Sequence, residues 1–190
     1  MCGIALNLRI AIKSKTERQQ METSDIILGK AKFEDWAALY RNLWSRAEAA
    51  EYMLWRISES EEDAERRILR VIEYQKNHDT YLVYLKKSGE AIGFAGIEKN
   101  APGIYSETGI ALGPEYTGKG YGKQVLRLLL DRCAAKGGKE FWYSCRSENA
   151  AAKGLASSMG FEYVRFEERT DPRNGKSYSL EYYVKKLQRG

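Results

Sequence analysis

The sequence has few of the residues that build metal sites and disulfide frameworks, and no long apolar run. Its 190 residues include three cysteines and one histidine. These residues are too few and too scattered to form a zinc site, a disulfide framework or a histidine-based hydrolase site. No metal is therefore expected. No stretch approaches the ~20 apolar residues of a membrane-spanning helix. The start lacks the pattern of a secretory signal, so the predicted location is the cytoplasm.

Charge and composition fit a globular domain. Basic residues outnumber acidic ones, 31 against 26, and the pI is near 9.0. The basic residues are dispersed without a recognised RNA- or DNA-binding motif, which disfavours nucleic acid as a partner. With 43% hydrophobic residues, a chain of this length can bury a sizeable core. Cys133, on an apolar helix face, and Cys145, in a strand, are predicted to be buried thiols.

Hydrophobic periodicity predicts an α/β domain with one mixed sheet covered by helices. Helices are expected from residue 34, over 45–55, from Ser60 with its acidic first turn, from about 120 to the Gly137-Gly138 pair, and over 148–159. Strands are expected over 25–29, 81–85, 91–97, 105–112 and 141–145, with two more flanking a turn at 172–175.

The most informative segment is the run PEYTGKGYGK, residues 114–123, between a predicted strand and a predicted helix. Its alternating glycines allow a tight turn with exposed amides, and the helix start adds unpaired N–H groups and the positive dipole end. The segment therefore predicts a phosphate site. Its spacing fits neither the dinucleotide fingerprint G-x-G-x-x-G nor the P-loop G-x-x-x-x-G-K-[ST].

The run instead resembles the acetyl-CoA loop of the GNAT N-acetyltransferase superfamily. ETGIAL at 107–112 is similar to that family's fourth strand, and NAAA at 149–152 with MGF at 159–161 to its second cofactor motif. The similarity covers residues 22–187 and is nearest to the branch of ribosomal-protein-alanine acetyltransferases. It implies the GNAT fold, a mostly antiparallel sheet whose fourth and fifth strands splay apart. Residues 21–190 are expected to form this domain, and residues 1–20 an extension with an extra strand and a linker.

The resemblance also implies the contacts to acetyl-CoA, the expected co-substrate. The pantetheine arm would lie in the gap between the splayed strands, against Ile110, Ala111 and Leu112. The pyrophosphate would rest on backbone amides of the loop, with Lys123 adding charge; the loop residues are Thr117, Gly118, Lys119, Gly120, Tyr121 and Gly122. Lys119 and Lys123 are equally explained as solvated lysines. Asn149 would bond the arm, although an N-cap role is the alternative.

Two departures from the family pattern stand out. Thr117 occupies a position where the family has Arg or Gln, a change that backbone amides can tolerate. Ala156 follows Leu155, where many relatives place a tyrosine as general acid. A thiolate is a good leaving group, so loss of that acid is not fatal to catalysis.

The implied reaction is direct attack of a primary amine, on a peptide N-terminus or a small molecule, on the acetyl thioester. An ammonium must first lose a proton, and Glu107 is the candidate base, with an exposed or ion-paired carboxylate as the alternative. Tyr143 and Ser144 would hold a water or orient the substrate. Two other functions are left open, a non-catalytic acyl-CoA-binding module and an RNA- or ribosome-associated adaptor, as is a homodimeric state.

Overall fold

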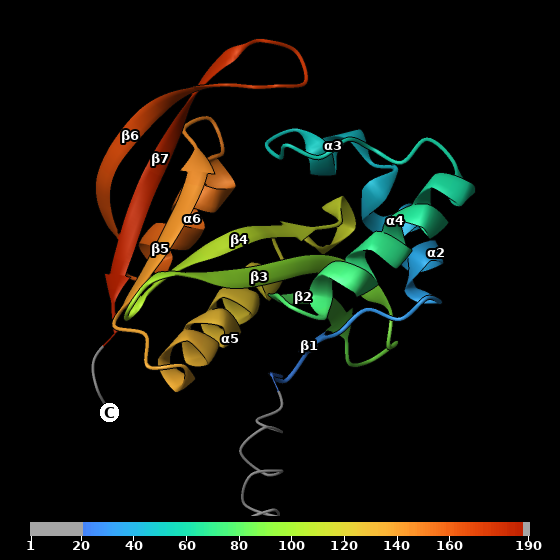
Figure 1. Ribbon diagram of the computed structural model, residues 1–190, viewed down its shortest axis with the longest axis horizontal. Coiled ribbons are helices and arrows are strands. Elements are labelled where there is room, and N and C mark those ends of the chain that lie inside the picture. Colours follow the sequence, from blue (N-terminus) through green and yellow to red (C-terminus); the bar gives the residue numbers. More distant parts are fainter. Residues whose placement is uncertain (1–20, 188–190) are drawn as a thin grey trace, which may run out of the picture.

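The computed structural model describes residues 21–187 and places their strands in one sheet, in the order β1-β2-β3-β4-β5-β7-β6 (Figure 1). Neighbouring strands are antiparallel except for β4 and β5, which run parallel. This confirms the predicted mixed, mostly antiparallel sheet. The strands are β1 (Ile26–Gly29), β2 (Asp79–Leu85), β3 (Ala91–Ala101), β4 (Ile104–Leu112), β5 (Glu140–Arg146), β6 (Glu162–Thr170) and β7 (Ser177–Lys186).

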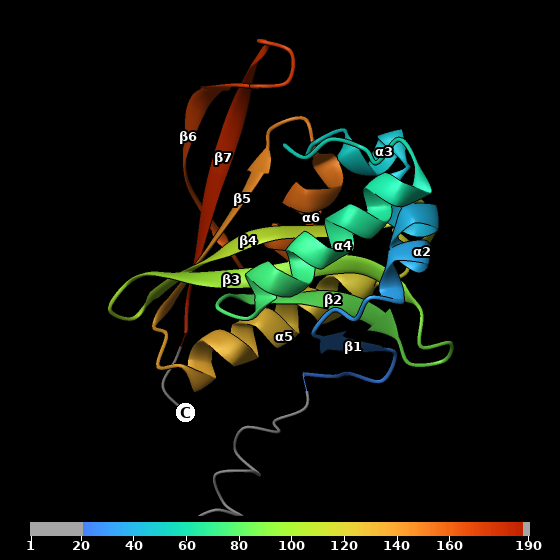
Figure 2. The same cartoon turned by 45° about the vertical axis from the view of Figure 1, so that its right-hand side comes forward.

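Helices cover both faces of the sheet (Figure 2). Alternation along the strands supplies two apolar layers, because Tyr81 and Val83 pack into a cluster with α5 while Leu82 packs against α2 and α4. None of the helices described between residues 21 and 187 is long and apolar enough to cross a membrane. The helices are α2 (Asp35–Leu39), the π-helix η1 (Tyr40–Trp44), α3 (Ala47–Ala50), α4 (Glu61–Gln75), the 3-10 helix η2 (Pro114–Tyr116), α5 (Tyr121–Ala135) and α6 (Ala150–Ser158).

The predicted helix over 45–55 is wrong, since only Ala47–Ala50 is helical there and the chain continues through turns and bends. Two carbonyls of this segment accept hydrogen bonds from a distant residue, since the Arg173 guanidinium donates to Ala50 at 3.0 Å and to Trp55 at 3.4 Å. The predicted extension, residues 1–20, lies outside the described residues. Cys133 and Cys145 are buried and unpaired thiols, as predicted.

Strands β4 and β5 part soon after they meet, as the family resemblance implied. They pair only at Ile104, Tyr105 and Ser106 of β4, after which β5 continues to pair with β7 on its other edge. A bulge lies just past the last pair, where Thr108 and Gly109 of β4 lie opposite a single residue of β3, Gly96. Gly109 has a φ of +117°, which a residue with a Cβ rarely adopts, so glycine permits this bend.

Candidate active site

The glycine loop between β4 and α5 presents a row of backbone amides. Gly118 and Gly120 have φ values of +71° and +82°, and a Cβ at either position would meet no atom within 4 Å. Among the described residues, no protein acceptor takes the amides of residues 118–123. These amides precede or begin the 15-residue helix α5, whose dipole adds partial positive charge. The loop is therefore an open cradle for an anionic group such as a phosphate.

Thr117 has a different role from the one expected. Its amide donates to the Pro114 carbonyl at 3.2 Å and its hydroxyl donates to the same oxygen at 2.8 Å. Both groups close the turn that enters the loop, so the amide of Thr117 is not free for a ligand. Lys119 and Lys123 are exposed and have no carboxylate partner in the part of the chain that the structure describes.

A cavity of 460 Å³, which we call the fork cavity, lies where β4 and β5 separate. Ile110 borders it, whereas Ala111 is buried in the cluster with α2 and α4 and Leu112 packs against the cluster with α5. Beyond Ser106, the edge of β4 that faces β5 has no strand partner among the described residues. Its backbone groups are therefore available to an extended ligand. The wall also includes Glu107, Ser144, Asn149 and Ala152.

Asn149 caps α6, because its Oδ1 accepts a hydrogen bond from the Ala152 amide at 2.9 Å. The N-cap alternative is thus observed. The residue also borders the fork cavity, and its side-chain NH₂ has no acceptor among the described residues. Glycine at position 122 brings the two helices close, since a Cβ there would lie 3.5 Å from Leu155 of α6. The start of α5 therefore lies against α6, the helix whose Asn149 and Ala152 border the fork cavity.

Glu107 stands at the point where the two strands part. The amide of Ser144 on β5 donates to Glu107 Oε1 at 3.3 Å and its hydroxyl donates to the same oxygen at 3.0 Å. The Gly109 amide donates to Oε2. Burial raises the pKa of the Glu107 carboxyl, although these hydrogen bonds oppose the rise. No basic side chain pairs with it within residues 21–187, and the residue is partly buried rather than exposed.

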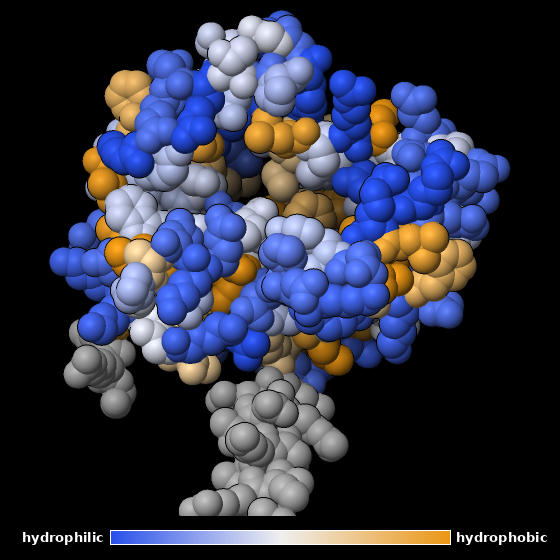
Figure 3. Space-filling model, viewed as in Figure 1, coloured by the Kyte–Doolittle hydropathy of each residue, from blue (hydrophilic) through white to orange (hydrophobic). Residues whose placement is uncertain are grey.

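A larger, open cavity of about 1590 Å³, which we call the α4 cavity, lies between α4 and the sheet. Figure 3 shows the molecule hollowed on this face, with apolar side chains inside the hollow. Trp55, Phe94 and Thr108 border both this cavity and the fork cavity, so the two adjoin. A molecule in the α4 cavity can therefore reach β4 beside Glu107.

Sequence reasoning missed several residues of this site. Thr108 reaches the α4 cavity because of the bulge, and a glycine inside a strand pattern is the signal that could have found it. Tyr52 and Met53, placed in a helix by periodicity, lie in the wall of the fork cavity. Tyr143, which was expected to hold a water or orient the substrate, borders the fork cavity but is only 5% exposed, so little of it can contact a ligand. Ala156, which stands where many relatives have a tyrosine, has no ionisable group and is fully buried in the cluster with α5.

Comparison with known proteins agrees with this geometry. Over 95 residues the chain is 36% identical to the N-alpha-acetyltransferase RimI of Mycobacterium tuberculosis. This match covers 48% of this chain and 58% of the relative. Over 52 residues it is 38% identical to the [ribosomal protein bS18]-alanine N-acetyltransferase of Escherichia coli K12. This second match covers 27% of this chain and 35% of the relative. The matched stretches thus span less than two thirds of these relatives.

The fold is shared with solved acetyltransferases. The structure of the microcin C7 self-immunity acetyltransferase MccE, in complex with acetyl-CoA and AMP, superposes with a TM-score of 0.75. It is 20% identical, and the match covers 87% of this chain and 94% of that protein. The family model described as "Acetyltransferase (GNAT) domain" matches residues 25–162. The chain belongs to the GNAT acetyltransferase family.

Proposed function

We propose that this protein transfers an acetyl group from acetyl-CoA to a primary amine. The observation that carries the proposal is the open row of amides at residues 118–123 beside two strands held apart by a bulge. Family membership supports it, as do the names of two relatives, an N-alpha-acetyltransferase and a ribosomal-protein-alanine N-acetyltransferase. A peptide N-terminus and a small amine are both within the proposed acceptor class.

The residues present fit acetyl-CoA. The open space over Gly118 and Gly120 leaves room for a pyrophosphate on free amides, and Lys119 and Lys123 would add positive charge. The fork cavity would hold the pantetheine arm, with the unpaired edge of β4 and the NH₂ of Asn149 as hydrogen-bonding groups. When bound, acetyl-CoA supplies an acetyl group activated as a thioester.

Glu107 is the proposed proton acceptor. An alkyl ammonium has a pKa of about 10.4 and an α-ammonium one near 8, so the acceptor must lose a proton before it can attack. Burial raises the pKa of Glu107, which makes its carboxylate a stronger base near neutral pH. Ser144 positions this carboxylate through its amide and hydroxyl. Glu107 borders the fork cavity, so the carboxylate lies where an amine entering through the α4 cavity would arrive.

The proposed transferase domain comprises residues 21–190. Met21 packs against the core, its carbonyl accepts the Leu28 amide at 2.7 Å, and Glu22 pairs with Lys86 at 3.0 Å. The family match begins at residue 25. A cytoplasmic location and a homodimeric state stay predictions.

The test is an acetyl-transfer assay with the full chain. Purified protein and acetyl-CoA are incubated with small amines and N-terminal peptides, and free thiol and acetylated product are measured together. We expect equal amounts of thiol and acetylated amine. Coenzyme binding without any acetylated product would contradict the proposal and favour a non-catalytic acyl-CoA-binding module. Binding of RNA that acetyl-CoA does not alter would favour the adaptor alternative.

A further inference from the structure

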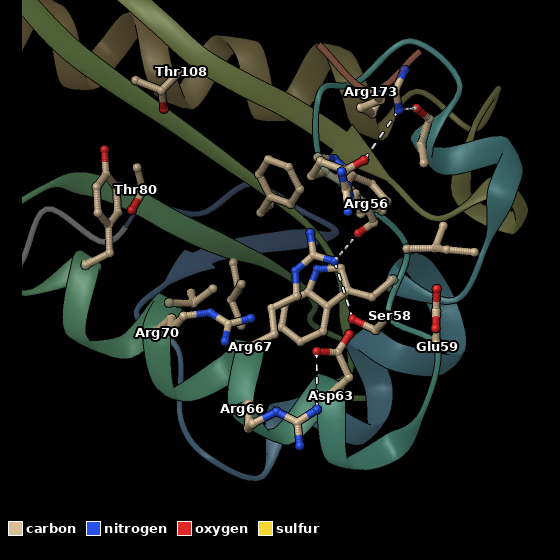
Figure 4. Close-up of a pocket in the computed structure, with 18 of the residues that line it drawn as sticks. Arg56, Ser58, Glu59, Asp63, Arg66, Arg67, Arg70, Thr80, Thr108 and Arg173 are labelled. Carbon is tan, nitrogen blue, oxygen red and sulfur yellow. Dashed lines mark hydrogen bonds and ion pairs between the residues drawn. The ribbon is translucent and has the colours of Figure 1, made fainter. Parts of the chain in front are cut away.

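Arg67 of α4 is a partly buried cation in the wall of the α4 cavity (Figure 4). Its guanidinium carbon lies 4.6 Å from the centre of the Trp44 ring and 4.7 Å from that of Trp55. Its Nη1 donates to the Arg56 carbonyl at 3.0 Å. Within residues 21–187, no carboxylate lies in salt-bridge distance of this guanidinium. The same nitrogen lies 3.5 Å from the Ser58 hydroxyl, so aromatic faces and two neutral oxygen acceptors replace the counter-ion that a buried cation usually has.

The electrostatics of Arg67 favour an anion nearby. Burial is the largest influence and lowers the pKa of the Arg67 guanidinium to about 10, with the charge of Arg70 acting in the same direction and that of Asp63 opposing it. The side chain remains charged at neutral pH. A partly desolvated charge without an opposite charge beside it is costly, and an anionic ligand would offset that cost.

Two further arginines border the same cavity without an acidic partner. In the described part of the chain, neither Arg56 nor Arg70 forms a salt bridge, and both are exposed. The other two arginines of the wall are engaged, Arg66 with Asp63 at 3.7 Å and Arg173 with Asp171 at 2.7 Å. Figure 4 shows Arg67 and Arg70 reaching from α4 toward the interior of the pocket, and Arg66 turned to Asp63.

The wall also holds a hydrogen-bond donor without an acceptor. The indole nitrogen of Trp55 is buried and has no partner among the described residues. Trp55 borders both the α4 cavity and the fork cavity. The acids of the α4 cavity are Glu51, Glu59 and Asp63, against five arginines, so positive charge predominates. Unpaired guanidinium groups and an unused N–H donor together form a site for oxygen anions.

We propose that the amine acceptor of this protein carries an anionic group, a carboxylate or a phosphate, which Arg67 binds in the α4 cavity with Arg56 and Arg70 beside it. The proposal rests on the acetyl transfer proposed above and adds the chemical class of the acceptor. The anion would be held under α4 while the amine reaches β4 beside Glu107. The α4 cavity, at about 1590 Å³, has room for a small molecule or the first residues of a peptide.

The first test uses matched acceptors that differ by one charge. Each is a short peptide amide with a free N-terminal alanine, and glutamate is compared with glutamine, and phosphoserine with serine, at successive positions. At saturating acetyl-CoA, we expect kcat/KM for at least one anionic peptide to exceed that of its neutral partner about tenfold or more. The glutamate and phosphoserine series distinguish carboxylate from phosphate recognition. Equal kcat/KM values within every pair would overturn the inference while leaving acetyl transfer intact.

The second test removes the arginines. Arg67→Gln and Arg70→Gln should each lower the ratio of kcat/KM for the anionic peptide to kcat/KM for its neutral partner, with acetyl-CoA affinity unchanged. Arg70 is exposed, so its variant tests the site even if Arg67→Gln does not fold.

Arg127→Gln, an exposed position on α5 outside the cavity, is the matched control and should keep the preference. An unchanged preference in folded Arg67→Gln and Arg70→Gln would overturn the site. Failure to acetylate any peptide would instead overturn the proposed acetyl transfer, and this inference with it.

Discussion

Glu107 has two roles in this account, as a bridge between the parted strands and as the proposed base. Its carboxylate accepts hydrogen bonds from Ser144 on β5 and from Gly109 in the bulge of β4. The next pair of the β4–β5 ladder would be Glu107 with Tyr143, and in its place the Glu107 side chain binds Ser144, the following residue of β5. The same contacts fix the carboxylate at the edge of the fork cavity. A variant must therefore separate loss of base from loss of structure.

Glu107→Gln removes the base but keeps the side-chain shape and an acceptor oxygen for the amide and hydroxyl of Ser144, although its NH₂ group replaces the oxygen that accepts the Gly109 amide. We expect kcat/KM to fall about a hundredfold near neutral pH. The deficit should shrink as pH rises, since more acceptor is then already deprotonated. In the wild type, burial raises the pKa of Glu107, so activity should increase with pH through that raised pKa, and this limb should be absent from the variant.

Glu162→Gln, at an exposed position on β6, is the control and should keep the wild-type profile. An equal deficit of Glu107→Gln at every pH would contradict a role in proton transfer. It would assign Glu107 to holding the strands apart.

At the scale of elements, the turn between β6 and β7 is tied to the segment that roofs the α4 cavity. Asp171, 1% exposed, pairs with Arg146 of β5 at 2.6 Å and with Arg173 at 2.7 Å. Arg173 in turn donates to the carbonyls of Ala50 and Trp55. Asp171 is therefore a positioning residue, which acts on the acceptor cavity through Arg173.

Asp171→Asn should raise KM for the acceptor on the order of tenfold without changing acetyl-CoA affinity, because one charge-assisted partner of Arg173 is lost. It should also lower Tm. Hydrogen bonds from Arg173 and Arg146 hold the pKa of Asp171 well below its usual range. Its contribution to stability is thus present above a pH of about 4 and is lost as the pH falls through the lowered pKa. The difference in Tm between the two proteins should shrink in acid.

Asp131→Asn, an exposed change on α5, should leave both KM and Tm unchanged. Equal changes in acceptor KM and acetyl-CoA affinity in Asp171→Asn would show that the tie serves the whole fold rather than the roof of the cavity.

Local sequence signals located most elements but not the ones held by distant contacts. Ser60 was expected to start a helix, and its hydroxyl accepts the Asp63 amide at 3.2 Å. Residues 45–55 carry apolar positions that suggested a helix. In the structure, two carbonyls of this segment instead accept hydrogen bonds from Arg173, more than a hundred residues away. The bulge in β4 was missed because ETGIAL was treated as a regular strand. The tight turn of the glycine loop was predictable because its glycines act locally, whereas the α4 cavity depends on how α4, the segment 44–60 and the sheet pack together.

Across the whole molecule, the account joins an anion cradle, a fork and an acceptor cavity into one path. The loop amides lie at one end, the fork cavity between β4 and β5 follows, and the α4 cavity adjoins it through Trp55, Phe94 and Thr108. The helices on the two faces of the sheet thus serve different ligands in this account, α5 the coenzyme and α4 the acceptor. This division rests on the coenzyme binding at the glycine loop.

The most direct test of that claim is the acetyl-CoA affinity of Gly120→Val, measured by isothermal titration calorimetry. Gly120 has a φ of +82°, which valine disfavours, and its side chain would enter the open space over the amides. Gly89→Val, in the turn between β2 and β3, is the matched control, with a φ of +72° and equally open surroundings. We predict that the dissociation constant rises about a hundredfold in folded Gly120→Val, because several hydrogen bonds to a charged group are lost, and stays unchanged in Gly89→Val. Unchanged affinity in folded Gly120→Val would contradict the account.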